Sequence, residues 1–260
     1  MFALITGGSQ GIGRCIAEEF AKRKINVLIV ALADASVEET ATFLREKYSI
    51  LVETFTTDLT KDSGAQEVYD FCQAKQITVQ YLINNAGMGY TDSFSGKTIG
   101  FHETLLKLNI LANVRLCHLF LEDMKKLPKA YIMNVSSMAG LFTMPFKSTY
   151  AASKQFIVNF SEALREEVRF TSVSVSVLFP TGVATNPETT TAVEKLGKIG
   201  KYVSSTPQII AAAGVKGLLA GKKRIIADFW SRLFATTRHI VPKDVVIWLV
   251  GKVLRKKFQQ

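Results

Sequence analysis

The chain of 260 residues is poor in the side chains that bind metals or form disulfides. Its only cysteines and histidines are Cys15, Cys72, Cys117, His102, His118 and His239. None of them belongs to a C-x-x-C or H-E-x-x-H motif, the spacings that bring several ligands to one zinc ion. We therefore expect no metal site and no disulfide framework, and we expect the cysteines to be buried fillers on helices.

The chain also lacks internal repeats, low-complexity tracts and linkers rich in Pro, Gly or Ser. This uninterrupted sequence, with 48% hydrophobic residues, favours one domain over residues 1–260. A strand-like apolar run already begins at Phe2 and leaves no room for a secretory leader before it. A cytoplasmic protein is therefore expected.

Acidic residues are scarce near the C-terminus. Residues 222–260 contain ten Lys and Arg residues against two Asp residues, a net charge of +8 out of the chain's +10. The apolar run 245–250 in this segment is too short to span a bilayer, which needs about 20 apolar residues. No nucleic-acid reading motif organises the charge, so binding to nucleic acid is not expected.

This basic, partly amphipathic C-terminal extension, residues 222–260, has three interpretations. A basic amphipathic helix suits peripheral contact with an anionic membrane surface. The same segment suits packing over the chain's own pocket or against a dimer partner. It also suits docking of an acidic acyl carrier or coenzyme A thioester. The sequence leaves the three open.

Short apolar runs alternate with helical stretches along the chain. The strand-like runs cover residues 2–5, 27–31, 51–55, 80–83, 130–135 and 173–179, and a seventh is expected near 224–227 after a helix at 207–219. Such alternation indicates parallel strands with helices on both faces. The sequence thus predicts an α/β fold of the Rossmann-like, doubly wound class with about seven strands.

A glycine-rich loop, Thr6-Gly7-Gly8-Ser9-Gln10-Gly11-Ile12-Gly13, follows the first strand. The next segment, residues 14–24, has one apolar face and is expected to be a helix. The N-terminus of a helix offers free N–H groups to a pyrophosphate, and glycine lets the backbone approach closely. The spacing differs from the common G-x-G-x-x-G fingerprint, so the loop alone is weak evidence.

Tyr150 and Lys154 stand four residues apart, and Ser137 lies thirteen residues before the tyrosine. On a helix this spacing puts Tyr150 and Lys154 on one face. An ammonium about 4 Å from a phenol favours phenolate by about 4 kcal/mol at an effective dielectric of about 20. The pKa of the tyrosine would then fall by up to roughly three units from about 10. A core aromatic residue and a surface charge can have the same spacing, so the interpretation of this pair depends on the motifs around it.

These motifs, together with further segments in the same order, resemble the short-chain dehydrogenase/reductase family over about residues 2–185. The further segments are Asp58-Leu59, Asn84-Asn85-Ala86-Gly87, Asn109, Asn134-Val135-Ser136-Ser137 and Pro180-Thr181-Gly182-Val183-Ala184-Thr185. The resemblance implies a catalytic centre of Asn109, Ser137, Tyr150 and Lys154. The distance to Tyr150 selects Ser137, and Ser136 is expected to bond the backbone instead.

The resemblance also implies a nicotinamide cofactor. Its implied binding residues are Gly7, Ser9, Gln10, Gly11, Ile12, Gly13, Leu32, Asp58, Leu59, Asn85, Ala86, Gly87, Tyr150, Lys154, Pro180, Gly182, Val183 and Thr185. An acidic residue at the end of the second strand would bind the ribose 2′-OH and repel a 2′-phosphate. Leu32 stands there, so we expect NADP and keep NAD as the alternative. Neither Gln10 nor Leu32 supplies an arginine for the phosphate, and Arg14 is either a phosphate partner or an exposed helix charge.

The implied reaction interconverts a carbonyl and a secondary alcohol, with Tyr150 as general acid and base. Ser137 would hold the carbonyl oxygen, Lys154 would lower the Tyr150 pKa and hold the nicotinamide ribose, and Asn109 would position a water. The alternative is a non-catalytic nucleotide-sensing or scaffold protein of the same fold, which has no chemical need for all four residues. An acyl hydrolase would need a G-x-S-x-G elbow, which the sequence lacks.

Apolar residues flank the expected site and favour a hydrophobic substrate such as a fatty acyl or steroid ketone. They are Met88, Tyr90, Phe94, Met138, Leu141, Phe142, Met144 and Phe146, and ordinary loop packing is their alternative role. Residues 186–202 have the composition of a lid. The family commonly forms homodimers or homotetramers. The residues that suit this contact, or the chain's own core, are Leu105, Leu108, Leu111, Phe156 and Phe160.

Overall fold

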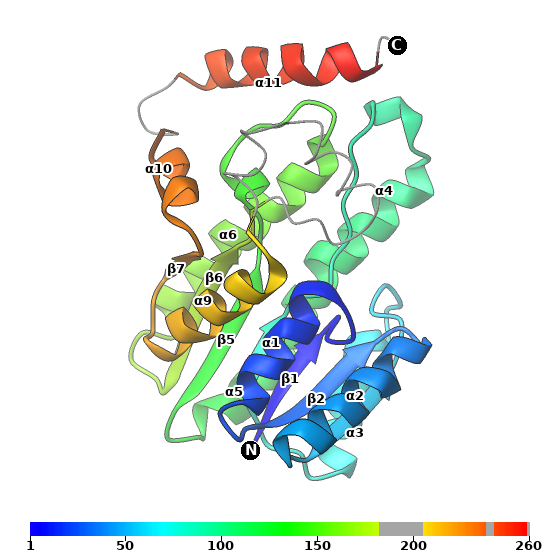
Figure 1. The fold of residues 1–260 in the computed structure, drawn as a ribbon, viewed down its shortest axis with the longest axis vertical. Helices are drawn as coiled ribbons and strands as arrows, with labels where there is room; N and C mark the ends of the chain where they lie inside the picture. Colours follow the sequence, from blue (N-terminus) through cyan, green and yellow to red (C-terminus); the bar gives the residue numbers. More distant parts are fainter. Residues whose placement is uncertain (182–204, 238–241, 259–260) are drawn as a thin grey trace.

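The computed structural model describes residues 1–181, 205–237 and 242–258. Within them, seven strands form one parallel sheet in the order β3-β2-β1-β4-β5-β6-β7 (Figure 1). The strands are β1 (Phe2–Thr6), β2 (Asn26–Ala31), β3 (Val52–Thr56), β4 (Val79–Asn84), β5 (Ala130–Val135), β6 (Val173–Phe179) and β7 (Arg224–Ile226). This arrangement confirms the predicted Rossmann-like fold. The strand order reverses between β1 and β4, where doubly wound sheets bind ligands at the carboxyl ends of their strands.

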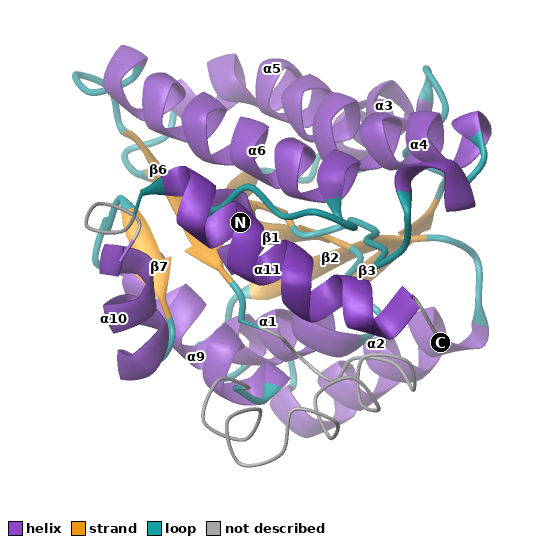
Figure 2. Cartoon of the chain, turned by 90° about the horizontal axis from the view of Figure 1, so that it is seen from above, coloured by secondary structure: helices purple, strands orange, loops and turns teal. Residues whose placement is uncertain are grey.

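Helices cover both faces of the sheet (Figure 2). The α-helices of the described residues are α1 (Gly11–Ala21), α2 (Ala35–Tyr48), α3 (Gly64–Ala74), α4 (Ile99–Leu106), α5 (Ala112–Lys125), α6 (Ser148–Glu167), α9 (Pro207–Leu219), α10 (Phe229–Thr237) and α11 (Lys243–Phe258). Helices α1, α2 and α9 pack on one face, and α3, α5 and α6 pack on the other. Neighbouring strand residues therefore enter different cores: Ile5 and Ile29 pack on the first face, and Leu4 and Leu28 on the second.

Helix α1 begins three residues earlier than the sequence predicts. Gly11, Ile12 and Gly13 already form its first turn, and the helix ends at Ala21 rather than near Lys24. The periodicity of apolar side chains reveals a helix only where side chains pack, and two of these three residues are glycines. The second half of the glycine loop is therefore helical.

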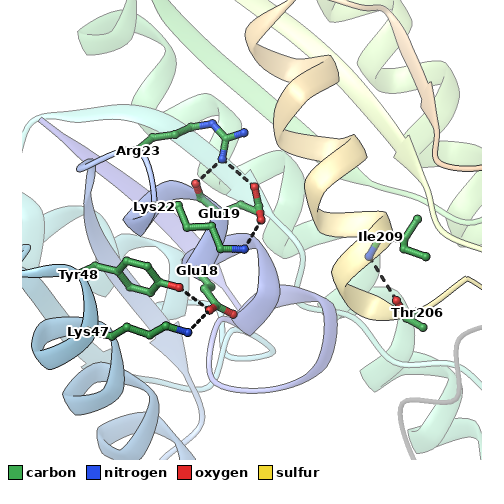
Figure 3. Close-up of polar contacts among 8 residues, drawn as sticks. All are labelled: Glu18, Glu19, Lys22, Arg23, Lys47, Tyr48, Thr206 and Ile209. Carbon is green, nitrogen blue, oxygen red and sulfur yellow. Dashed lines mark hydrogen bonds and ion pairs between the residues drawn. The ribbon is translucent and has the colours of Figure 1, made fainter.

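Ion pairs and hydrogen bonds hold α2 against α1 (Figure 3). The Glu18 carboxylate accepts hydrogen bonds from the Tyr48 hydroxyl at 2.5 Å and the Lys47 ammonium at 3.1 Å. On the next residue of α1, Glu19 pairs with Lys22 at 2.6 Å and Arg23 at 2.7 Å. The Glu18 contacts join α2 to α1, and the Glu19 pairs stabilise the C-terminal end of α1.

One continuous helical stretch in the described residues, Ile99–Lys125, is long and apolar enough to cross a membrane by length and composition. It consists of α4, a π-helical turn at Lys107–Leu111, and α5. Its residues Leu116 and Phe120 pack against the sheet in the second core. In this fold the stretch therefore forms part of a covering layer.

The cysteines lie on helices, as expected. Cys72 on α3 and Cys117 on α5 are buried, and Cys15 on α1 is half-buried. Burial raises the pKa of both the Cys72 and the Cys117 thiol to about 12. These two thiols are thus protonated at neutral pH and act as apolar core side chains.

Candidate active site

The glycine loop after β1 has backbone geometry that side chains would disturb. Gly7 and Gly11 have φ angles of +62° and +54°, in the left-handed region that favours glycine. A Cβ added to Gly13 would lie 2.0 Å from the carbonyl oxygen of Gly7, far inside van der Waals contact. The loop therefore folds tightly back on the first turn of α1.

The start of α1 leaves its amide groups available to a ligand. Gln10 stands at the N-cap but makes no side-chain cap, because its side-chain amide donates to the Ser36 hydroxyl at 3.0 Å. Ser9 is buried, and its carbonyl oxygen accepts from the Thr40 hydroxyl at 2.9 Å. Uncapped amides at the positive end of a helix suit a phosphate. A dinucleotide pyrophosphate therefore fits the first turn of α1.

The Asn-Asn-Ala-Gly segment after β4 braces the glycine loop. The Asn85 side-chain amide donates to the carbonyl oxygens of Thr6 at 2.9 Å and Gly7 at 3.1 Å. In return, the Thr6 hydroxyl accepts from the N–H groups of Asn85 at 3.0 Å and Ala86 at 2.9 Å. These bonds join the ends of β1 and β4 at the point where the strand order reverses.

The residues after β2 leave an open position at Leu32, whose side chain is 62% exposed. The nearby carboxylate of Asp34 caps α2 by accepting from the Ser36 N–H at 2.8 Å and from the Ser36 hydroxyl. Arg14 is exposed, with its guanidinium 5.3 Å from the centre of the Phe43 ring. Arg14 therefore matches the interpretation as an exposed helix charge.

The remaining residues predicted to bind the cofactor differ in burial and in hydrogen bonding. Asp58, after β3, accepts from the N–H and hydroxyl of Thr60 at 2.9 and 2.7 Å, which lowers the pKa of Asp58. Leu59 is buried in the second core. The carbonyl oxygen of Pro180 accepts from the Met138 N–H at 3.0 Å. Gly182, Val183 and Thr185, and the expected lid at 186–202, lie outside the described residues.

Lys154 is buried on α6, with 5% of its surface exposed, and its ammonium donates to the Val135 carbonyl oxygen at 3.0 Å. The Ser136 hydroxyl donates to the main-chain oxygen of Lys154 at 2.7 Å. Ser136 therefore bonds the backbone, as expected from the sequence. Ser137, the next residue, lies two residues after the end of β5, and its hydroxyl accepts from the Ala139 N–H at 3.1 Å.

Asn109 lies in the π-helical turn between α4 and α5 and is buried. Its amide oxygen accepts from the Met88 N–H at 2.9 Å, and its amide nitrogen donates to the Met88 carbonyl at 2.9 Å and to the Ser153 hydroxyl at 3.0 Å. Sequence reasoning missed Ser153, although it stands inside the Tyr150-to-Lys154 motif. Asn109 thus ties the loop after β4 to α6.

Two glycines of this loop mark where the site residues meet. A Cβ on Gly87 would lie 3.0 Å from the Asn109 amide oxygen and 3.1 Å from the Lys154 nitrogen. A Cβ on Gly89 would lie 3.0 Å from the Tyr150 ring. The structure therefore brings Asn109, Tyr150 and Lys154 around the segment that also braces the glycine loop.

The expected lowering of the Tyr150 pKa is not found. Burial raises the pKa of Tyr150, and a hydrogen bond with the Ser137 hydroxyl opposes that shift. Burial also lowers the pKa of Lys154 to about 8. The prediction was wrong because it counted only the attraction between ammonium and phenolate and left out desolvation. In the structure burial desolvates both groups, and the ammonium donates to Val135.

Several of the apolar residues predicted to line the substrate site pack in the core instead. Met138 and Leu141 pack against the small core cluster of Val158, Val177 and Phe179. Tyr90 is buried against neighbouring aromatic side chains, and Phe94 is exposed. Met138, Leu141 and Tyr90 therefore pack inside the fold, whereas Phe94 faces solvent.

Comparisons with known proteins agree with this geometry. The family profile described as short chain dehydrogenase matches residues 1–195. Very-long-chain 3-oxoacyl-CoA reductase of Macaca fascicularis is 29% identical over 223 residues, covering 83% of this chain and 67% of that protein. Human 17-beta-hydroxysteroid dehydrogenase type 3 is 33% identical over 188 residues, covering 71% of this chain and 59% of that protein. The matched regions thus span about two thirds or less of these relatives' lengths.

Solved structures of similar fold include complexes with either nicotinamide cofactor. A short-chain dehydrogenase from Sphingobium yanoikuyae in complex with NADPH is 25% identical, with a TM-score of 0.78 over 92% of this chain and 94% of that one. A short-chain dehydrogenase/reductase from Burkholderia phymatum in complex with NAD is 21% identical, with a TM-score of 0.80 over 92% of both chains. With the match over residues 1–195, the chain belongs to the short chain dehydrogenase family and is an oxidoreductase that acts on CH–OH and C=O groups.

Proposed function

We propose that this protein is an NADP(H)-dependent oxidoreductase that interconverts a carbonyl and a secondary alcohol on a hydrophobic substrate. The observation that carries the proposal is that Asn109 and Lys154 meet at Gly87 and Tyr150 lies against Gly89, in the segment after β4 that also braces the glycine loop. A nucleotide sensor or scaffold of the same fold would need the loop but has no use for a buried lysine and a half-buried tyrosine at the same segment. Such a non-catalytic protein is the alternative.

The proposed mechanism assigns each proton to a named atom. A bound nicotinamide would supply or accept the hydride. During reduction the Tyr150 hydroxyl gives its proton to the carbonyl oxygen as negative charge develops there. The Ser137 hydroxyl donates a hydrogen bond to the same oxygen and holds it in reach. Because burial lowers the pKa of Lys154 to about 8, this side chain can return a proton to Tyr150 near neutral pH.

Most of the described residues that the sequence predicts to bind the cofactor lie after strands, at the carboxyl edge of the sheet. Glycines of the loop and the first turn of α1 hold the pyrophosphate, and Asp58, Ala86 and Pro180 border the same edge. We favour NADP(H) because exposed Leu32 offers no carboxylate to repel a 2′-phosphate. The carboxylate of Asp34 is engaged in capping α2, which leaves that position without a free acid. NAD(H) is the alternative cofactor.

For the substrate we propose a fatty acyl or steroid ketone. The two relatives carry names that refer to a 3-oxoacyl-CoA and a hydroxysteroid. On this chain, Phe94 is exposed, and the half-buried side chains of Phe142, Met144 and Phe146 lie in the segment that leads into α6. A sugar substrate would leave these apolar side chains without contacts.

We propose a single cytoplasmic domain over residues 1–260, with 222–260 as its basic C-terminal extension. One continuous sheet from β1 to β7 supports this division. A homodimer or homotetramer would cover Leu111 on the helical layer and Phe156 on α6, which are both exposed. By contrast, Leu105, Leu108 and Phe160, predicted for the same contact, pack in the chain's own core.

We also propose that α11 lies on an anionic membrane surface. In Figure 1 this helix lies across the molecule, beyond the carboxyl ends of the strands. A Cβ on its buried Gly251 would lie 3.7 Å from Pro145, in the loop before α6. The opposite face, at helical spacing, carries exposed apolar side chains and one lysine. They are Val245, Trp248, Leu249, Lys252 and Val253.

A spectrophotometric screen tests the proposed function. Purified protein is offered 3-oxoacyl-CoA thioesters, 17-oxosteroids and the matching alcohols with NADPH, NADH and both oxidised cofactors. We expect turnover with an apolar ketone and a preference for NADPH. Cofactor binding without turnover on any of these classes would favour the non-catalytic alternative.

A further inference from the structure

The first turn of α6, which carries Tyr150, is held by side chains from across the site. Its second residue, Thr149, has one of the amide groups that no helical carbonyl can satisfy. Ser, Thr, Asp or Asn usually caps such amides, but Lys147 stands at the N-cap, and a lysine side chain has no acceptor. Here the Tyr90 hydroxyl, from the loop after β4, accepts from the Thr149 N–H at 3.3 Å.

His102 on α4 binds the same threonine through its side chain. Its Nε2 atom lies 3.1 Å from the carbonyl oxygen of Phe94, which can only accept, so Nε2 carries the proton. In the neutral ring Nδ1 then accepts from the Thr149 hydroxyl at 3.1 Å. The Thr149 hydroxyl accepts in turn from the Tyr90 hydroxyl at 3.4 Å. One chain of hydrogen bonds thus runs from the loop through α6 to α4.

Packing fixes this arrangement. His102 is 5% exposed and stacks on the Phe94 ring at 4.7 Å between ring centres. The Tyr90 ring meets His102 edge-on at 5.4 Å and Phe101 edge-on at 5.5 Å. The His102 ring contacts the rings of Phe94, Tyr90 and Phe101, so it cannot rotate without displacing them. The orientation of His102 is therefore set by the fold, and Thr149 is the group that it orients.

The location of the chain of bonds connects it to the chemistry. Thr149 directly precedes Tyr150, and Gly89 directly precedes Tyr90. Because a Cβ on Gly89 would lie 3.0 Å from the Tyr150 ring, the loop that carries Tyr90 packs against the Tyr150 side chain. A shift of about 1 Å in a reacting group can lower the rate roughly 100-fold. Small movements of the first turn of α6 therefore matter to Tyr150.

We propose that His102 and Tyr90 are positioning residues, which act through Thr149 to hold the Tyr150 phenol in place for proton transfer. The inference rests on the proposed reductase function for its kinetic consequence only. It assigns a role to a histidine that belongs to no cluster of metal-ligating side chains among the described residues and to no sequence motif. The side chains touch neither substrate nor cofactor in this role.

Two substitutions of His102 separate its two hydrogen bonds. In H102N the amide oxygen occupies the place of Nδ1 and can accept from Thr149, but the bond to Phe94 is lost. In H102Q the amide nitrogen reaches the place of Nε2 and can donate to Phe94, but the bond to Thr149 is lost. Both variants remove the ring, so they lose the same stacking. The pair T149S and T149V likewise keeps and removes the threonine hydroxyl.

The first measurement is amide hydrogen exchange by mass spectrometry on residues 146–152 of the full-length protein. We expect exchange to be about three- to tenfold faster in H102Q and T149V than in wild type, the effect of one lost hydrogen bond, and near wild type in H102N and T149S. Equal exchange in H102Q and H102N would overturn the proposal, because the ring would then serve packing alone. This readout needs no substrate.

The second measurement is steady-state reduction of a medium-chain 3-oxoacyl-CoA with NADPH. We expect kcat to fall about three- to tenfold in H102Q and in T149V, and to fall no further in the double variant H102Q/T149V. The NADPH dissociation constant should stay unchanged in all three. Additive losses, or unchanged kcat beside faster exchange, would contradict the positioning role. Wild-type protein that turns over no carbonyl would instead refute the proposed function, and the exchange comparison would still decide whether His102 holds α6.

Discussion

The Lys154 ammonium donates a hydrogen bond to the Val135 carbonyl oxygen over 3.0 Å, and this contact ties helix α6 to the end of β5. The lysine is buried, so its charge is costly even with this partner, and its pKa falls from 10.5 to about 8. Desolvation therefore dominates at the proposed site. That dominance has a measurable consequence for stability.

Lys154→Met should change how stability depends on pH. Below about pH 8 both the folded and the unfolded lysine are protonated, and the folded protein bears the full cost of the buried charge. Between about pH 8 and 10.5 the unfolded state binds more protons, so the free energy of unfolding rises with pH, by about 3 kcal/mol in total. Below pH 8, K154M should therefore be more stable than wild type, and the difference should shrink as the pH approaches 10.5.

Urea unfolding of both proteins at several pH values checks this prediction. The quantity to compare is the difference in the free energy of unfolding between the two proteins. Burial raises the pKa of Cys72 and of Cys117 to about 12, so both thiols make the folded protein less stable as the pH rises above about 9. These thiols are present in both proteins and cancel. A stability difference that stays constant from pH 7 to 10.5 would show that Lys154 does not titrate in this range.

Tyr150→Phe should remove the proton donor and keep the fold. We expect kcat to fall by roughly 100- to 10,000-fold, the usual contribution of a positioned acid or base. The NADPH dissociation constant should stay near that of wild type, because the glycine loop is unchanged. Tyr69→Phe is the matched control, since its hydroxyl donates to Asp123 at 2.7 Å on the α3 and α5 surface. Near-full turnover by Y150F would reject the proposed mechanism.

Gly13→Ala should disrupt the glycine loop. The added Cβ would lie 2.0 Å from the Gly7 carbonyl oxygen, and backbone atoms cannot yield as a flexible side chain can. We expect at least about 1–3 kcal/mol of destabilisation, with loss of NADPH binding. Gly100→Ala in α4 is the control, because nothing lies within 4 Å of its added Cβ and alanine favours a helix by up to about 1 kcal/mol. Thermal unfolding and cofactor fluorescence report both effects.

The sequence predicted the parts of this fold that depend on local pattern. The strands at 130–135 and 173–179 and the helix at 207–219 match the structure to the residue. The two strands are runs of mostly buried side chains, and the helix has one buried face and a clear boundary at Pro207 in its first turn. The start of α1 was missed because glycines carry no side-chain periodicity.

The surroundings of the site depend on contacts between distant segments, which periodicity does not report. The apolar character of Tyr90 suggested a substrate wall, but α4 brings His102 and Phe101 against it and buries it. For the same reason His102 looked isolated in the sequence, although Thr149 lies 3.1 Å away in the fold. The pKa of Tyr150 could not be derived from its spacing to Lys154, because desolvation is set by everything that packs around the pair.

Leu32→Asp should shift cofactor choice toward NADH. The side chain is 62% exposed directly after β2, so the substitution should not disturb the core. A carboxylate at this place would bind the ribose 2′-OH and repel a 2′-phosphate, and we expect the ratio of kcat/KM for NADPH over NADH to fall at least about tenfold. Leu32→Asn has the same shape without the charge and should change the ratio far less. Equal ratios in the two variants would mean that the 2′-phosphate binds elsewhere.

The exposed face of α11 should bind anionic lipid. We expect the wild-type protein to float with vesicles of 70% phosphatidylcholine and 30% phosphatidylserine, and much less with pure phosphatidylcholine. The double variant W248S/V253S removes two apolar side chains that are 61% and 62% exposed, which should weaken binding roughly tenfold or more. Phe170→Ser is the control, because Phe170 is 95% exposed in the loop after α6, away from α11. If W248S/V253S binds vesicles as wild type does but changes the molecular mass measured by light scattering, the face of α11 is instead an interface between copies of the chain.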